Sequence, residues 1–126
     1  MIFRTRGEIA PAVETNRSEA LSILKKWHAE RTPLRCQIPL RQLAAAFNAR
    51  VYSVSDTLLV LTSDDLLTEL NIPFSDSLFF GYGDTRHDPD EVVYDATLII
   101  FLESIPLVGR GDMIILREFK EPPLAV

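Results

Sequence analysis

The sequence feature that most constrains the fold is the stretch from Leu34 to Ile72, where short apolar-alternating segments follow one another with almost no spacer. In its first segment, Leu34, Cys36, Ile38 and Leu40 are separated by polar residues or proline. A period of two is typical of strands with one buried face. Closure would remove the exposed edges of such strands, so we expect a small antiparallel β-barrel. An open α+β sheet is the alternative.

One amphipathic helix precedes this stretch. Asn16, with Glu19 three residues later, has the form of a helix start, since an N-cap side chain and an acid both suit the positive end of the dipole. Thr32-Pro33 ends the pattern, because proline disfavours the helical conformation of the preceding residue. We therefore expect a helix over 17–31. Its apolar face recurs at spacings of three and four: Leu21, Leu24, Trp27 and His28.

Further strand patterns follow the first one to the end of the chain. We expect them at 49–54, 57–62, 66–72, 78–82, 92–102 and 112–119, whereas 43–47 fits a helical turn or a strand. The fold class is thus mainly β, α+β by content, with six or seven strands. We expect a flexible arm over 1–15, or a loose strand at Ile2 to Arg4 within it, then one domain over 16–120 and a frayed tail over 121–126.

Composition and charge narrow the class of protein. The 126 residues contain no apolar run that could cross a bilayer and no apolar core of a secretory signal, so we expect a cytoplasmic protein without a membrane partner. The single cysteine, Cys36, fits a small core residue. Residues 1–50 carry nine Lys or Arg against four Glu, and residues 51–126 carry four against fourteen acids. The net charge of -5 argues against a long nucleic acid as partner.

No set of residues indicates catalysis. His28 and His87 are the only histidines, and neither has a nucleophile close in sequence. The acidic loop 84–91 lacks the regular ligand spacing of a calcium loop. We therefore expect no catalytic residues, no metal site and no cofactor, and an enzyme is the less favoured class.

Two arginines stand just before the first strand, in Arg31-Thr-Pro-Leu-Arg35, and Ala49 to Leu61 follows. Over residues 31–73 this resembles the PilZ family, six-stranded barrels that bind cyclic dinucleotides through paired arginines and a downstream Asp-x-Ser-x-x-Gly element. The resemblance implies that Arg31, Arg35, Ser53 and Ser55 bind a cyclic dinucleotide such as c-di-GMP. Ser53 replaces the motif aspartate and Leu58 the motif glycine. A helix followed by short bent strands also resembles the Sm-like barrels, which assemble into rings.

A shorter segment, from Phe80-Gly-Tyr-Gly-Asp to the strand pattern at 95–103, resembles the end of FKBP-type prolyl isomerases. That family has an aromatic pocket floored by a tryptophan in mid-chain, whereas Trp27 is the only tryptophan and lies in the expected helix. We therefore favour isomerase activity less than either cyclic-dinucleotide binding or a non-enzymatic binding role.

The absence of a catalytic set favours a non-enzymatic binding or regulatory module, which meets another protein or a second copy of itself. Its contact residues would be exposed cations and half-exposed aromatic side chains, because both anchor protein interfaces. The residues that fit this description are Arg41, Arg50, Tyr52 and Tyr82.

Overall fold

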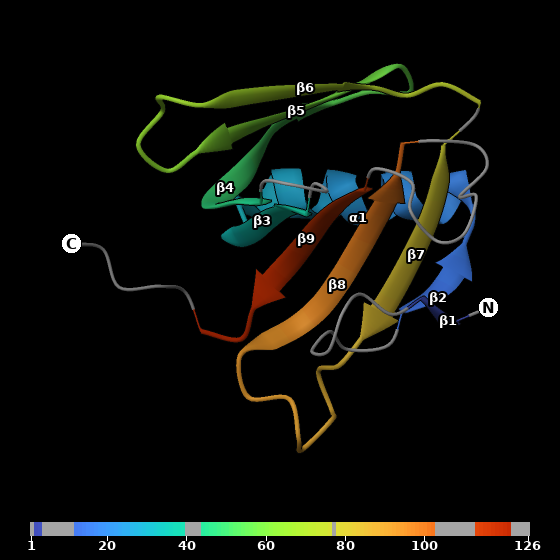
Figure 1. Cartoon of the computed structure of the whole chain (residues 1–126), viewed down its shortest axis with the longest axis vertical. Coiled ribbons are helices and arrows are strands. Elements are labelled where there is room, and N and C mark those ends of the chain that lie inside the picture. The colour runs from blue at the N-terminus through green and yellow to red at the C-terminus, as the bar shows by residue number, and fades with distance from the viewer. Residues whose placement is uncertain (1, 4–11, 40–43, 77, 103–112, 122–126) are drawn as a thin grey trace.

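The computed structural model describes residues 2–3, 12–39, 44–76, 78–102 and 113–121. Within these ranges one helix and nine strands follow in chain order (Figure 1). They are β1 (Ile2–Phe3), β2 (Ala12–Thr15), α1 (Arg17–Glu30), β3 (Leu34–Pro39), β4 (Ala44–Val54), β5 (Leu58–Ser63), β6 (Glu69–Pro73), β7 (Phe79–Asp84), β8 (Tyr94–Phe101) and β9 (Met113–Phe119).

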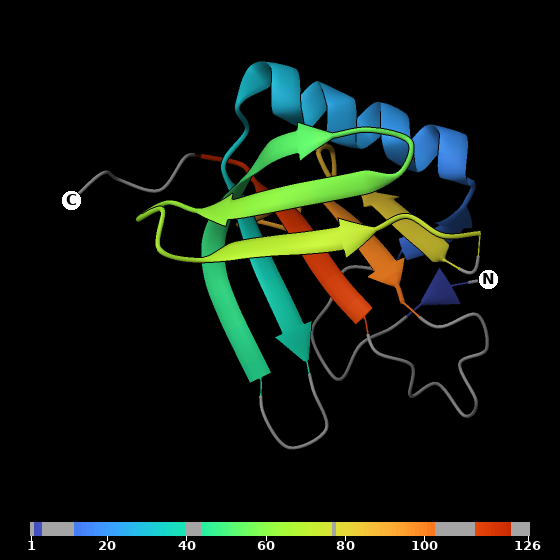
Figure 2. The same cartoon turned by 90° about the horizontal axis from the view of Figure 1, so that it is seen from above.

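The strands form a single antiparallel sheet in the order β1-β2-β7-β8-β9-β3-β4-β5-β6. The mainly β class with one helix is thereby confirmed. The closed barrel is not: within the described ranges β1 and β6 are edges, and no pairing joins them. The sheet bends at β4, which pairs with β3 through its first half and with β5 through its second, with a bulge between Val51 and Ser53. The bend wraps the sheet partway around the helix, which covers one face without any closing strand (Figure 2).

Several expected strands agree with the structure, and others are shifted. β4, β5 and β6 form the expected antiparallel meander. β4 extends through the ambiguous 43–47 segment as far as residue 44, and β2 lies inside the range expected to be a flexible arm, where it pairs with β7. The strand expected over 66–72 begins only at Glu69, because Leu66 has a left-handed backbone (φ 62°) that no strand contains.

α1 starts where the Asn16 pattern indicated. The Asn16 side-chain oxygen accepts a hydrogen bond from the Glu19 backbone N–H at 2.7 Å, and Arg31 caps the other end with a left-handed backbone (φ 53°). The buried stripe consists of Ala20, Leu21, Leu24 and Trp27. His28 was expected in this stripe but is exposed, and Ala20 takes the additional place on the apolar face.

The main core lies between α1 and the sheet face that it covers. Its fully buried members include Leu24, Leu34, Leu61 and Leu98. Cys36 is 0% exposed in the same cluster, as the sequence indicated. Burial in this apolar setting disfavours the thiolate and raises the pKa of Cys36 to about 12, against a smaller lowering by Arg35.

A partly buried polar network joins α1 to the last strand. The Trp27 indole Nε1–H donates to Glu118 Oε1 at 2.7 Å. The other Glu118 oxygen lies 3.5 Å from Arg86 Nη2, and Asp95 lies 3.8 Å from Arg86 and 3.0 Å from Lys120. The hydrogen bond to Glu118 satisfies the one polar atom of the buried indole ring, and the ion pairs around it link Glu118 to Asp95 through Arg86.

The opposite face of the sheet carries a buried cation. Neighbouring residues on a strand point to opposite faces, so Arg117 lies away from α1 while Glu118 faces it. Arg117 is 6% exposed. Its guanidinium donates to Thr97 Oγ1 at 3.3 Å, lies 3.5 Å from Glu91 Oε1 and stacks over the Tyr94 ring at 4.0 Å. The charge of Arg117 is therefore neutralised inside the fold.

Candidate functional site

The most exposed large apolar side chains of the described residues lie together at the tip of the β5–β6 hairpin. Leu66 is 79% exposed and Leu67 is 86% exposed. The next residue in this ranking, Val92, lies at 76% on a different loop, before β8. We refer to residues 64–68 as the hairpin tip. Two adjacent leucines in water are a feature of contact surfaces, whereas single exposed apolar residues are ordinary.

Side-chain hydrogen bonds cross the hairpin tip and restrain its backbone. Asp65 Oδ1 accepts hydrogen bonds from the Ser63 hydroxyl and from the Leu67 backbone N–H, the latter at 3.0 Å. Ser63 Oγ in turn accepts from the Thr68 N–H at 3.0 Å. The hydrogen bond from Ser63, followed by that from Leu67, lowers the pKa of Asp65. The two leucines are thus presented by an ordered turn.

The backbone of Leu66 is strained. Its φ of 62° lies in the left-handed region, where Cβ contacts cost a residue other than glycine about 1–2 kcal/mol. Glycine would relieve this strain and would remove the exposed apolar side chain. Backbone strain of this kind concentrates at functional sites, so it adds to the argument that the leucine itself matters at this position.

The hairpin tip is anchored to the helix end through Arg50. The Asp64 N–H donates to the Asn48 carbonyl at 3.0 Å, and the Asp64 carboxylate lies 3.7 Å from Arg50 Nε. Arg50 Nη1 also donates to the Arg31 carbonyl at 2.8 Å. The side chain of Arg50, which we expected to contact a partner, is 48% exposed. Its charge is already paired with Asp64, an acid of the second half of the chain.

The four residues of the expected nucleotide site lie in different places. Arg31 forms the helix C-cap, and Arg35 on β3 donates to Asn48 Oδ1 at 3.0 Å. Ser53 follows Asn48 by five residues on β4, which corresponds to roughly 16 Å along a strand. Ser55 Oγ accepts hydrogen bonds from the Thr57 and Leu58 N–H groups in the β4–β5 turn. The structure brings Arg31 close to Arg50 but does not bring the serines to Arg35.

The remaining expected contact residues have different surroundings. Tyr52 is 65% exposed at the β4 bulge. Tyr82 is half-buried against the main core, and desolvation, followed by the charge of Asp84, raises its pKa. Arg41 lies outside the described residues. Of this group, Tyr52 alone combines an aromatic ring with high exposure.

The acidic loop 84–91 uses its carboxylates on its own backbone. Asp84 accepts from the Arg86 N–H at 2.9 Å, Asp88 from the Asp90 N–H at 2.8 Å, and Glu91 from the Val93 N–H at 3.0 Å. Among the described residues, no group of three or more His, Cys, Asp or Glu side chains could hold a metal ion. Local turn capping accounts for Asp84, Asp88 and one oxygen of Glu91, whose other oxygen faces Arg117.

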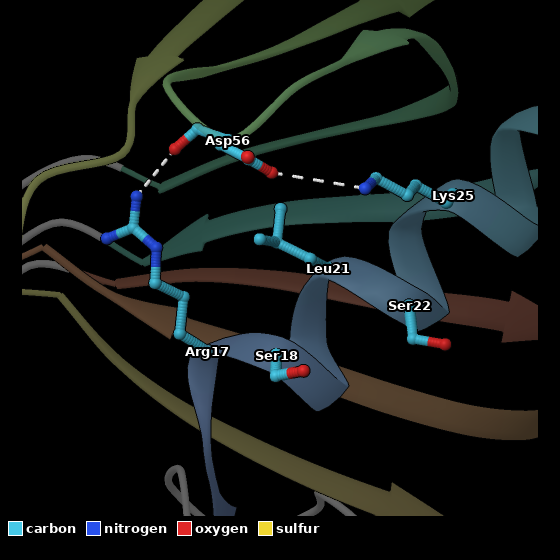
Figure 3. A pocket seen from close by; sticks show the side chains of 6 residues that line it. All are labelled: Arg17, Ser18, Leu21, Ser22, Lys25 and Asp56. Atoms are coloured by element: carbon cyan, nitrogen blue, oxygen red, sulfur yellow. Dashed lines mark hydrogen bonds and ion pairs between the residues drawn. The ribbon is translucent and has the colours of Figure 1, made fainter.

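A shallow pocket of about 740 Å³ lies between the first turns of α1 and the β4–β5 turn (Figure 3). Its two cations face Asp56: Arg17 donates to the Asp56 carbonyl, and Lys25 lies 3.9 Å from the Asp56 carboxylate. Arg17 also pairs with Asp76 at 3.7 Å. Because acids of the second half of the chain neutralise the cations, this pocket offers no concentrated charge to an anionic ligand.

Sequence reasoning missed both the hairpin tip and this pocket. Leu66 and Leu67 lie in a turn and not in the strand predicted over 66–72. Two consecutive leucines interrupt a period of two, and that interruption is the signal that could have placed them in a turn. The pocket has no local signal, since Arg17 and Asp56 are 39 residues apart.

Comparison with known proteins identifies no significantly similar protein. The chain matches no protein-family model, and neither a curated protein nor a solved structure is significantly similar to it. In the part of the chain that the structure describes, no helix is long and apolar enough to span a bilayer.

Proposed function

We propose that this chain is a non-enzymatic protein-binding module and that the hairpin tip is its contact surface. The single observation that carries the proposal is the exposed pair Leu66 and Leu67, held by the hydrogen bonds of Asp65 and Ser63. An ordered turn loses little conformational freedom on binding, so more of the contact energy remains as affinity.

The composition of the hairpin tip indicates the chemistry of its partner. Burial of one leucine contributes about 1.5–3 kcal/mol, so the two leucines are the main apolar contribution that the hairpin tip makes to a complex. Asp64, Asp65 and Glu69 are exposed around them. The partner that fits is a protein with an apolar pocket bordered by Lys or Arg, since its charge would complement the acidic border.

A capture experiment with matched variants tests the proposal. The unaltered chain, the double variant Leu66→Ser/Leu67→Ser and the control Val92→Ser are each immobilised, and proteins retained from a cell extract are quantified by mass spectrometry. Val92 is also highly exposed, but it lies on another loop. We expect the unaltered chain and the control to retain the same specific proteins. The amount of these proteins retained by the double variant should be at least tenfold lower. Retention that is equal on all three chains, or absent from the unaltered one, would refute the proposal.

The second candidate is a PilZ-like binder of a cyclic dinucleotide, which also implies the closed barrel. The contact between Arg50 Nη1 and the Arg31 backbone carbonyl supports it, because it brings a further cation beside a residue that the PilZ resemblance assigns to the ligand. Calorimetric titration with c-di-GMP at micromolar concentration tests it. Binding that is lost in Arg31→Ala/Arg35→Ala supports this candidate, and no binding to the unaltered chain rejects it.

A further inference from the structure

The outer edge of β6 is free of any neighbouring strand among the described residues (Figure 1). The register with β5 determines which backbone groups point outward. The Ser63 N–H donates to the Thr68 carbonyl, and the Phe74 N–H donates to the Thr57 carbonyl, both at 2.9 Å. Hydrogen-bonded pairs alternate along an antiparallel ladder, so Leu70 and Ile72 direct their backbone groups toward β5.

Glu69, Asn71 and Pro73 therefore direct their backbone groups away from the sheet. All three residues are exposed. Pro73 has no N–H, so the free edge offers two donors, from Glu69 and Asn71, and three carbonyl acceptors. A proline at this place leaves the pairing with β5 intact, because its nitrogen faces outward.

We infer that β6 pairs antiparallel with β6 of a second copy of this chain, in a register centred on Asn71. This inference goes beyond the proposed function, since it concerns the backbone edge of β6 and not the two leucines of the hairpin tip. In this register Asn71 faces its own counterpart, and Glu69 faces Pro73 of the second copy. The two Asn71 residues exchange both of their backbone hydrogen bonds, and each Glu69 N–H donates to a Pro73 carbonyl. Both outward donors of each copy are satisfied.

The side chains of β6 are compatible with the same register. Leu70 would face Ile72 of the second copy on the core side of the sheet, where Ile72 is 3% exposed and Leu70 is half-buried. On the other side, the two Glu69 carboxylates lie at opposite ends of the paired strands. A shift that paired Glu69 with Asn71 would bring the carboxylates closer and would shorten the overlap, so charge favours the centred register.

Two five-residue strands form a small interface, well below the area of a permanent dimer. We therefore expect a reversible equilibrium. Light scattering over a concentration series should show the average mass rising from 14.2 kDa toward twice that value.

Disulfide trapping tests the register. Directly opposed residues in a hydrogen-bonded pair have Cα atoms about 5.5 Å apart, inside the disulfide range of roughly 4.4–6.8 Å. Under mild oxidation with diamide, Asn71→Cys should form a covalent dimer at least tenfold faster than Glu69→Cys, whose own counterpart lies four residues along the strand, roughly 13 Å away. An equal mixture of Glu69→Cys and Pro73→Cys should cross-link to each other. The unaltered chain gives the background rate of cross-linking, since its single cysteine, Cys36, is fully buried.

The two proposals fail separately. Equal cross-linking of Asn71→Cys and Glu69→Cys, together with a mass that stays at 14.2 kDa, would overturn the β6 pairing and leave the hairpin tip as a contact for other proteins. Fast cross-linking of Asn71→Cys alone, with capture unaffected by Leu66→Ser/Leu67→Ser, would support the pairing and refute the role of the two leucines.

Discussion

Replacing Trp27 by phenylalanine should destabilise the protein strongly. The indole is 2% exposed, and its N–H donates to Glu118 at 2.7 Å. A hydrogen bond to a charged group contributes about 1.5–3 kcal/mol, and loss of the larger ring removes roughly 1 kcal/mol of apolar burial. The free energy of unfolding should therefore fall by about 3 kcal/mol. For a chain of 126 residues this corresponds to a decrease in Tm of roughly 11 °C.

Far-UV circular dichroism is the suitable assay, because Trp27→Phe removes the only tryptophan. Thermal and urea unfolding of the variant are compared with those of Glu118→Gln. The glutamine retains a carbonyl oxygen for the indole N–H but loses the charge that faces Arg86, so it should cost less than about 1 kcal/mol. A loss below 1 kcal/mol for Trp27→Phe, or equal losses for both variants, would refute this account of how α1 is fixed to β9.

Three further predictions concern single groups. Cys36 should resist alkylation in the folded protein at pH 8, and rapid labelling of native protein would contradict this. The contribution of its raised pKa to stability is complete below the ordinary thiol pKa of 9.0 and should be lost as the pH rises toward about 12. Asp65 has a lowered pKa, so the stability that its carboxylate contributes is present above pH 3.8 and lost as the pH falls through that lowered pKa. The difference in unfolding free energy between the unaltered chain and Asp65→Asn should therefore vanish in acid. A difference that persists there would contradict the role of the Asp65 carboxylate in the turn. Arg117→Met should cost about 3–5 kcal/mol in urea unfolding, because it leaves the largely buried Glu91 carboxylate without its cation. The added change Glu91→Gln should recover part of that loss, and no recovery would rule out the ion pair as the cause.

Local patterns in the sequence were sufficient for the helix and for most of the strands. Asn16 and Glu19 marked the start of α1, and the alternation around Cys36 marked β3 and its buried face. These signals are local, since a cap and a period of two depend on neighbouring residues. The same reasoning missed β2, because only its pairing with β7, 65 to 69 residues away, makes Ala12–Thr15 a strand.

Closure of the sheet and the position of the contact surface could not be derived in this way. Whether β6 meets another strand depends on the bend of β4, which no single segment encodes. Arg50 was expected to face a partner, yet Asp64 lies beside it, because charges from the two halves of the chain meet only after folding. The strained backbone of Leu66 has no counterpart in the composition of the turn, where glycine would be the ordinary choice.

Amide hydrogen exchange, followed residue by residue at low and high protein concentration and with a captured partner, locates the contact surfaces on the chain. We expect new protection confined to residues 66–73: at the Glu69 and Asn71 amides with rising concentration, and at the Leu66 and Leu67 amides with the partner. Protection that arises instead at the pocket lined by Arg17 and Lys25, or no change in the β5–β6 hairpin under either condition, would contradict the account.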